Sequence, residues 1–145
     1  MSNLHFLSII PRAIKRLTIL LLTASIPLIS LAEDFEYNGL KFNIISETDL
    51  TCGVTSNTPK YFGDISIPSS AYYNGKTYKV TEICYNAFSY CKELTSVNIP
   101  TSVTSIGERA FENCEGLSSI IIPNSVTKID RLAFFYCQGL SSVVI

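Results

Sequence analysis

The stretch Ile106–Lys128, IGERAFENCEGLSSIIIPNSVTK, aligns without a gap with the residues on both sides of it. Residues 83–105, ICYNAFSYCKELTSVNIPTSVTS, precede it, and residues 129–145, IDRLAFFYCQGLSSVVI, follow it. Several columns recur every 23 residues: Phe88, Phe111, Phe134; Cys91, Cys114, Cys137; Leu94, Leu117, Leu140; Ile99, Ile122, Ile145. A fixed period of this length predicts a solenoid, in which each coil buries its apolar side only against its neighbours.

Each unit contains an alternating segment that predicts a short strand. Val97 and Ile99 are two residues apart, so they face the same side of an extended segment while Asn98 points away. The proline that follows lacks a backbone donor and ends the strand. Residues 103–106 predict a second short strand on another side of the coil. Gly107 and the Ala-Phe pair after it predict a tight bend and then about one helical turn.

Repeats of 20–29 residues with one strand in each coil form the leucine-rich class. We therefore expect an α/β-type leucine-rich-repeat solenoid that is dominated by strands. It would contain about three to four coils of 23 residues and an N-terminal β-hairpin cap.

The unit also resembles the repeat of BspA-type leucine-rich-repeat proteins, a family found on the surface of many bacteria, particularly Bacteroidetes-like ones, and of some protozoa. The shared positions are Ile106, Gly107, Ala110, Phe111, Cys114, Leu117, Ser119, Ile122, Pro123, Ser125, Val126 and Thr127. The resemblance is strong over residues 83–145 and weaker back to about Gly63, and it departs where Cys84 and Asp130 replace Gly107. It implies a surface protein that binds proteins of a host or of neighbouring cells.

Residues 1–32 have the pattern of a secretory signal peptide. Three basic residues precede an uncharged, mostly apolar run of 15 residues, 17–31, whereas a membrane span needs about 20. The run ends in the small-x-small sequence Ser30-Leu31-Ala32. We expect cleavage after Ala32 and a secreted or cell-surface protein with no membrane span in the mature chain. An uncleaved N-terminal anchor is the alternative.

The mature chain would be acidic and would contain no histidine. Residues 33–145 keep all 12 acidic residues and lose three of the 11 basic ones, which leaves a net charge of −4. His5, the only histidine, lies in the predicted signal. This charge, without a basic cluster, argues against binding to nucleic acid or to anionic membranes.

Residues 33–62 are expected to form a β cap over the first coil. Apolar and polar residues alternate on both sides of Asn38-Gly39, which is a strong hairpin signal. Residues 63–145 would hold the repeats, with a second Asn-Gly hairpin, at residues 71–80, inserted in the first coil and projecting from its edge. The sequence stops at Ile145 within a strand column, so we expect an incomplete C-terminal coil: a fragment or shortened paralogue, or an exposed edge that needs a partner.

The cysteines permit two interpretations. Cys91, Cys114 and Cys137 recur once per coil, which favours small buried residues that fill the same niche in each coil. A disulfide or metal ladder is the alternative, although side chains in register point in parallel and three ligands in a line are not a tetrahedral site. Cys52 and Cys84 have no obvious partner, and the sequence does not give the redox state of any of the five.

The sequence shows no catalytic constellation, and we expect no enzyme activity, cofactor or metal. Without a histidine after residue 32, neither a Ser-His-Asp nor a Cys-His arrangement is available. Glu108, Glu112 and Glu115 could form an acid pair, but a solvated convex face is the preferred interpretation.

The outward positions of the strands are the candidate binding surface, because stacked strands form a rigid, gently curved sheet. This candidate protein-binding strand face consists of Ser66, Thr95, Asn98, Ser118, Ile121, Ser141 and Val144. Ile121 and Val144 form an apolar contact patch on it or are simply residues with high β-propensity at exposed positions. The predicted function is an adhesion-type protein–protein interaction module; the alternative is a passive spacer or truncated fragment of a larger surface protein.

Overall fold

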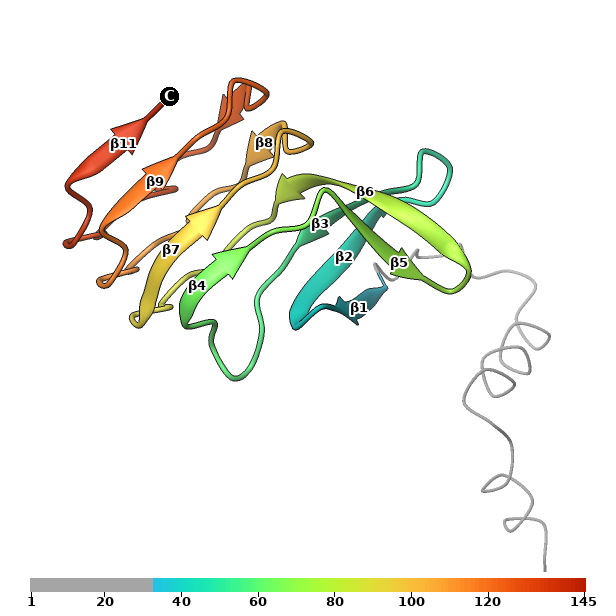
Figure 1. Ribbon diagram of the computed structural model, residues 1–145, viewed down its shortest axis with the longest axis horizontal. Helices are drawn as coiled ribbons and strands as arrows, with labels where there is room; N and C mark the ends of the chain where they lie inside the picture. The colour runs from blue at the N-terminus through green and yellow to red at the C-terminus, as the bar shows by residue number, and fades with distance from the viewer. Residues whose placement is uncertain (1–32) are drawn as a thin grey trace, which may run out of the picture. The chain divides into compact units, whose positions relative to one another are not determined.

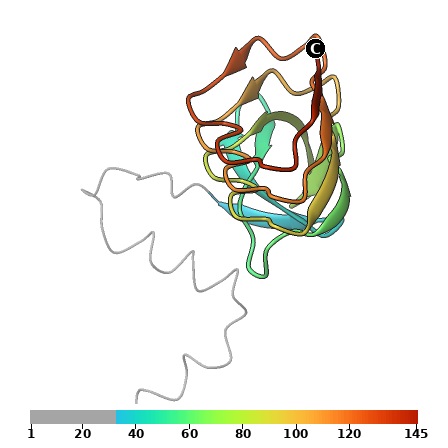
Figure 2. The ribbon, with the colours of Figure 1, turned by 90° about the vertical axis from the view of Figure 1, so that its left-hand side faces the viewer.

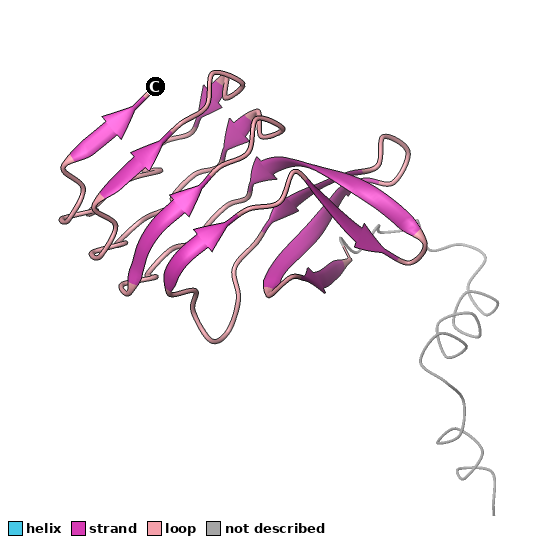
Figure 3. Ribbon diagram, in the orientation of Figure 1, coloured by secondary structure: helices cyan, strands magenta, loops and turns pink. Residues whose placement is uncertain are grey.

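The computed structural model describes residues 33–145, which form eleven strands and no helix (Figures 1 and 3). The predicted signal peptide, residues 1–32, lies outside the described residues. The strands are β1 (Asp34–Tyr37), β2 (Leu40–Ser46), β3 (Thr51–Val54), β4 (Gly63–Ser66), β5 (Ser70–Tyr73), β6 (Lys76–Ile83), β7 (Leu94–Asn98), β8 (Ser105–Ile106), β9 (Ser119–Ile121), β10 (Lys128–Ile129) and β11 (Ser142–Val144).

The strands form two sheets on two sides of a solenoid, with the coils stacked one behind another (Figure 2). Sheet A has the order β1-β2-β3-β6-β8-β10, with β5 added to β6, and sheet B has the order β11-β9-β7-β4. Neighbouring coils pair in parallel at the 23-residue offset, as between Ile106 and Ile129 in sheet A and between Ser119 and Ser142 in sheet B. The predicted strand-dominated leucine-rich-repeat solenoid is therefore confirmed.

A row of stacked aromatic rings fills the interior. The centroids of Phe88 and Phe111 are 5.2 Å apart, and those of Phe111 and Phe134 are also 5.2 Å apart, with 3° between the planes in both pairs. Tyr61 begins the row, since its ring lies 5.1 Å from that of Phe88 at 48°. Tyr61 belongs to the loop before the first coil, so the 23-residue period does not reveal it.

The helical turn expected after Gly107 is replaced by consecutive tight turns. Ala110 N–H donates to Gly107 O at 3.2 Å, and Glu112 N–H donates to Arg109 O at 3.1 Å. Arg109 and Asn113 have φ angles of 55° and 56°, and a right-handed helix excludes such left-handed residues. The same two positions are left-handed in the coils before and after: Asn86, Tyr90, Leu132 and Tyr136.

The Asn-Gly sequences both form hairpin turns, and the second hairpin packs against the cap through Tyr73 and Phe35, whose ring centroids are 4.6 Å apart. β5 and β6 pair antiparallel around Asn74-Gly75, and β6 then continues between β3 and β8 in sheet A. Tyr78 of β6 is buried, with its ring 5.9 Å from that of Phe35 in β1. Burial of this aromatic side chain holds the hairpin against the cap.

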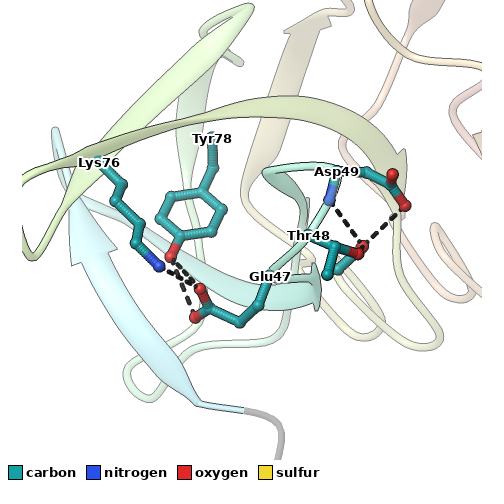
Figure 4. A network of polar contacts seen from close by, with 6 residues as sticks. Glu47, Thr48, Asp49, Lys76 and Tyr78 are labelled. Carbon is teal, nitrogen blue, oxygen red and sulfur yellow. Dashed lines mark hydrogen bonds and ion pairs between the residues drawn. The ribbon is translucent and has the colours of Figure 1, made fainter.

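Glu47, in the loop between β2 and β3, fastens the cap to this hairpin (Figure 4). Its carboxylate accepts hydrogen bonds from Tyr78 Oη at 3.0 and 2.9 Å and forms an ion pair with Lys76 at 2.8 Å. Bonding to Lys76 and Tyr78 lowers the pKa of Glu47. Beside it, Ser46 Oγ donates to Asp49 Oδ2 at 2.8 Å, which shapes the same loop.

Candidate binding face

Sheet B places four of the predicted residues in one row. Ser66 pairs with Asn98, Asn98 with Ile121, and Ile121 with Val144. All four side chains are exposed. The residues on either side of Ser66, Asn98 and Ile121 turn toward the solenoid interior, whereas those on either side of Val144 are exposed as well. The arrangement expected from sequence is present as a structure; its use in binding remains a prediction.

The chemistry of this row changes along the solenoid axis. At the cap end, Asn98 Nδ2 donates to Ser66 Oγ at 3.4 Å, so the polar groups there bond one another. At the other end, Ile121 and Val144 are 68% and 54% exposed. A shallow depression lies between β7 and β9, where the polar part of the row meets the apolar part; it is lined by Ser96, Val97, Asn98, Ser119, Ile120 and Ile121.

The other three predicted residues flank this row. Thr95 lies within β7, whereas Ser118 and Ser141 immediately precede β9 and β11. Ser141 N–H and Oγ–H both donate to Ser118 O, at 3.0 and 3.1 Å. The hydroxyl hydrogen of Ser141 and the backbone carbonyl of Ser118 are therefore used between coils.

Asp64 is a polar residue of this face that the sequence analysis missed. Its Oδ1 accepts hydrogen bonds from Thr95 Oγ1 at 2.7 Å and from Ser96 Oγ at 2.6 Å. The hydrogen bond from Ser96, which has the larger effect, and the one from Thr95 both lower the pKa of Asp64. A β-bulge in the pairing of β4 with β7 places both hydroxyls at this one carboxylate. The sequence gives no signal for the bulge other than the weak match of the first coil to the repeat.

The recurring cysteines pack inside the coils as free thiols. Cys91 and Cys114 are buried and Cys137 is half-buried. Cys114 Sγ–H donates to Phe88 O at 3.1 Å, and Cys137 Sγ–H donates to Phe111 O at 2.9 Å. The thiols of Cys114 and Cys137 therefore connect their coils to the preceding ones, in agreement with the packing interpretation.

Each of the three candidate carboxylates forms an ion pair, and Arg109 lies between two of them, 3.8 Å from Glu108 and 3.9 Å from Glu112. Glu108 lies 2.9 Å from Arg131 Nε, and Glu115 lies 2.8 Å from Lys92 Nζ. Glu112 lies 3.9 Å from Arg109 Nε and accepts from Ser89 Oγ at 3.5 Å. Within residues 33–145, no group of three His, Cys, Asp or Glu side chains is arranged to hold a metal ion.

No helix in the part of the chain that the structure describes is both long and apolar enough to cross a membrane.

Comparison with known proteins matches residues 57–145 to the BspA type leucine rich repeat region, in six copies. A leucine rich cell surface protein from Faecalibacterium prausnitzii A2-165 is 33% identical, with a TM-score of 0.65 over 76% of this chain and 30% of its own. A leucine-rich repeat protein from Bacteroides ovatus is 35% identical, with a TM-score of 0.68 over 78% of this chain and 30% of its own. The leucine rich repeat protein of T. pallidum is 26% identical, with a TM-score of 0.64 over 78% of this chain and 50% of its own.

This chain thus spans less than a third of the length of the first two similar structures. The search of curated proteins found no match.

Proposed function

The chain belongs to the BspA-type leucine-rich-repeat family, and from this premise we propose that it is a protein-binding module, exported by its N-terminal signal, that acts by adhesion and not by catalysis. Its partner would be a surface protein of a host or of a neighbouring cell. The description of the Faecalibacterium protein as a cell surface protein supports the location. The division of the candidate carboxylates among ion pairs supports a role without catalysis.

One observation carries the proposal: two large apolar side chains, Ile121 and Val144, are adjacent and exposed on sheet B. Partner burial of such side chains contributes about 25 cal/mol per Å² of apolar surface. The polar end of the same row would set the orientation of the partner, since its hydrogen bonds have fixed geometry.

The test compares two surfaces of the same solenoid. The fluorescently labelled full chain is incubated with intact host epithelial cells and with neighbouring bacteria, and bound fluorescence is measured by flow cytometry. The double variant Ile121→Asp and Val144→Asp should lose binding because each charge would have to be desolvated at the contact.

The matched control is Ile129→Asp. Ile129 is also an exposed isoleucine, but it lies in β10 of sheet A. This variant should bind like the unchanged chain. Equal binding by the double variant and the control, or no binding by the unchanged chain to any cell tested, would favour the passive spacer.

A further inference from the structure

A second recognition feature lies where the cap meets sheet B. An open cleft of about 350 Å³ separates the tip of the β1–β2 hairpin from β4. It is lined by Asn38, Gly39, Leu40, Asn57, Pro59, Lys60, Tyr61, Phe62, Asp64, Ile65 and Ser66. Sheet B ends at this cleft, because β4 pairs only with β7.

The backbone of β4 presents unpaired groups to the cleft. Ile67 N–H donates to Asn98 O at 3.1 Å, so Ser66 C=O, in the same peptide unit, points the opposite way. Alternation along the strand turns Ser66 N–H and Asp64 C=O to that side as well. No described residue forms a hydrogen bond with these three groups. An open edge of this kind is a template for another strand.

The chain itself does not cover the edge, because the preceding loop is held away from it. Tyr61 Oη accepts from Lys41 N–H at 2.9 Å and donates to Thr55 O at 2.9 Å. These bonds fix the loop between β3 and β4 to β2, and residues 55–62 form no strand beside β4 (Figure 1).

Two side chains at the cleft indicate what would fill it. Phe62 is 69% exposed, which is unusual for a residue of its size. Lys60 is exposed and has no acidic partner within the described residues. An occupant with an apolar side chain for Phe62 and a carboxylate for Lys60 would complement both.

We propose that β4 takes up an extended peptide segment of a partner protein as a further strand of sheet B, with one apolar and one acidic side chain at Phe62 and Lys60. The main chain of the peptide would bond Ser66 N–H and C=O, which is recognition by strand addition. This inference rests on the proposed function as a protein-binding module and assigns to it the backbone edge of β4, beside the polar end of the row that also contains Ile121 and Val144.

The experiment removes one backbone donor. A phage-displayed random peptide library is selected on the full chain, and the affinities of the selected peptides are measured by calorimetry. Ser66→Pro deletes only the N–H that faces the cleft, and proline is tolerated at an edge position of this kind. Ser66→Ala, which keeps the N–H, is the control.

We expect to select peptides whose affinity for Ser66→Pro is about tenfold lower than for the unchanged chain, which corresponds to one lost hydrogen bond. Their affinity for Ser66→Ala should equal that for the unchanged chain. Equal affinity for both variants, or a library without any peptide that distinguishes them, overturns the proposal. Hydrogen exchange of the unchanged chain gives a result even if Ser66→Pro fails to fold. The Ser66 amide should exchange fast in the free chain and be protected by bound peptide; an unprotected amide contradicts strand addition.

The two proposals can be contradicted independently of each other. If the Ile121 and Val144 variant loses cell binding but still binds the selected peptides, both proposals stand independently. If Ser66→Pro keeps every peptide while the Ile121 and Val144 variant loses the cells, only strand addition is wrong.

Discussion

The rings of Phe111 and Phe134 lie parallel, with centroids 5.2 Å apart and 3° between their planes, and Phe88 repeats this geometry on the other side of Phe111. Phe111 is therefore stacked on both faces and fully buried. Phe134, in the last coil, is stacked on one face and remains half-buried. The loss of stability when one of these phenylalanines is replaced by alanine should therefore depend on its position in the row of stacked rings.

Phe111→Ala should lower the free energy of unfolding by about 3–5 kcal/mol, because it removes a buried ring and leaves a cavity between two others. Phe134→Ala should cost less. Urea unfolding followed by circular dichroism measures both. Phe62→Ala, at an exposed site, is the control and should change stability by less than about 0.5 kcal/mol. Equal losses at Phe111 and Phe134 would contradict the stacking argument.

Gly116→Ala should destabilise the solenoid because the coils approach one another closely there. A Cβ at Gly116 would lie 2.7 Å from Lys92 O and 3.0 Å from Leu94 O, both backbone atoms of the preceding coil. We expect a loss of about 1–3 kcal/mol from overpacking, measured by urea unfolding. Ser118→Ala, two residues away and exposed, is the control and should change the free energy of unfolding little. An unchanged Gly116→Ala variant would show that the coils can separate without cost.

The repeat period was sufficient to predict the parts of the fold that depend on neighbouring coils. It located the buried columns of Phe88 and Phe111, and it predicted that Asn98 points outward and that Ile121 and Val144 follow in the same row. The sequence pattern behind these features occurs in each repeat unit, so a single sequence contains several copies of the same signal.

Features that depend on one conformation or on one coil could not be predicted in this way. Arg109 and Asn113 adopt positive φ although neither is glycine, and inter-coil bonds such as Phe111 N–H to Ala133 O, at 2.8 Å, hold the turn that replaces a helix there. Gly107 is needed because a Cβ would lie 2.9 Å from backbone atoms of the preceding coil, and not for its φ. Tyr61, in the loop before the first coil, and Asp64, in β4, each occur once, so no second copy exists to reveal them.

Glu47→Gln should destabilise the protein more at neutral pH than in acid. The pKa of Glu47 is lowered in the folded state by bonds to Lys76 and Tyr78, so its ionised form stabilises the fold above the unfolded pKa of about 4.5. This contribution is lost as the pH falls through the folded pKa, where the unchanged chain also becomes protonated.

Urea midpoints at pH 7 and pH 3 measure the effect. The midpoint of Glu47→Gln should be lower than that of the unchanged chain at pH 7, and the difference should shrink at pH 3. Asp49→Asn, in the same loop but without a bond to β6, is the control for the loss of one charge. A difference that stays constant with pH would show that Glu47 does not act through its charge.

Alkaline pH should destabilise the fold through thiols that include Cys52, which is buried, and Cys84, which is half-buried. Burial raises the pKa of Cys52 and of Cys84 from the ordinary value of 9.0 to about 12. A raised folded pKa means that the fold favours the neutral thiol, so this contribution is complete below pH 9 and is lost as the pH rises toward 12. The urea midpoint under reducing conditions should therefore fall between pH 9 and pH 11. Cys52→Ala should lower the midpoint at every pH, because it opens a cavity, but should make its fall with pH less steep. A slope identical to that of the unchanged chain would show that Cys52 becomes charged without first leaving the core.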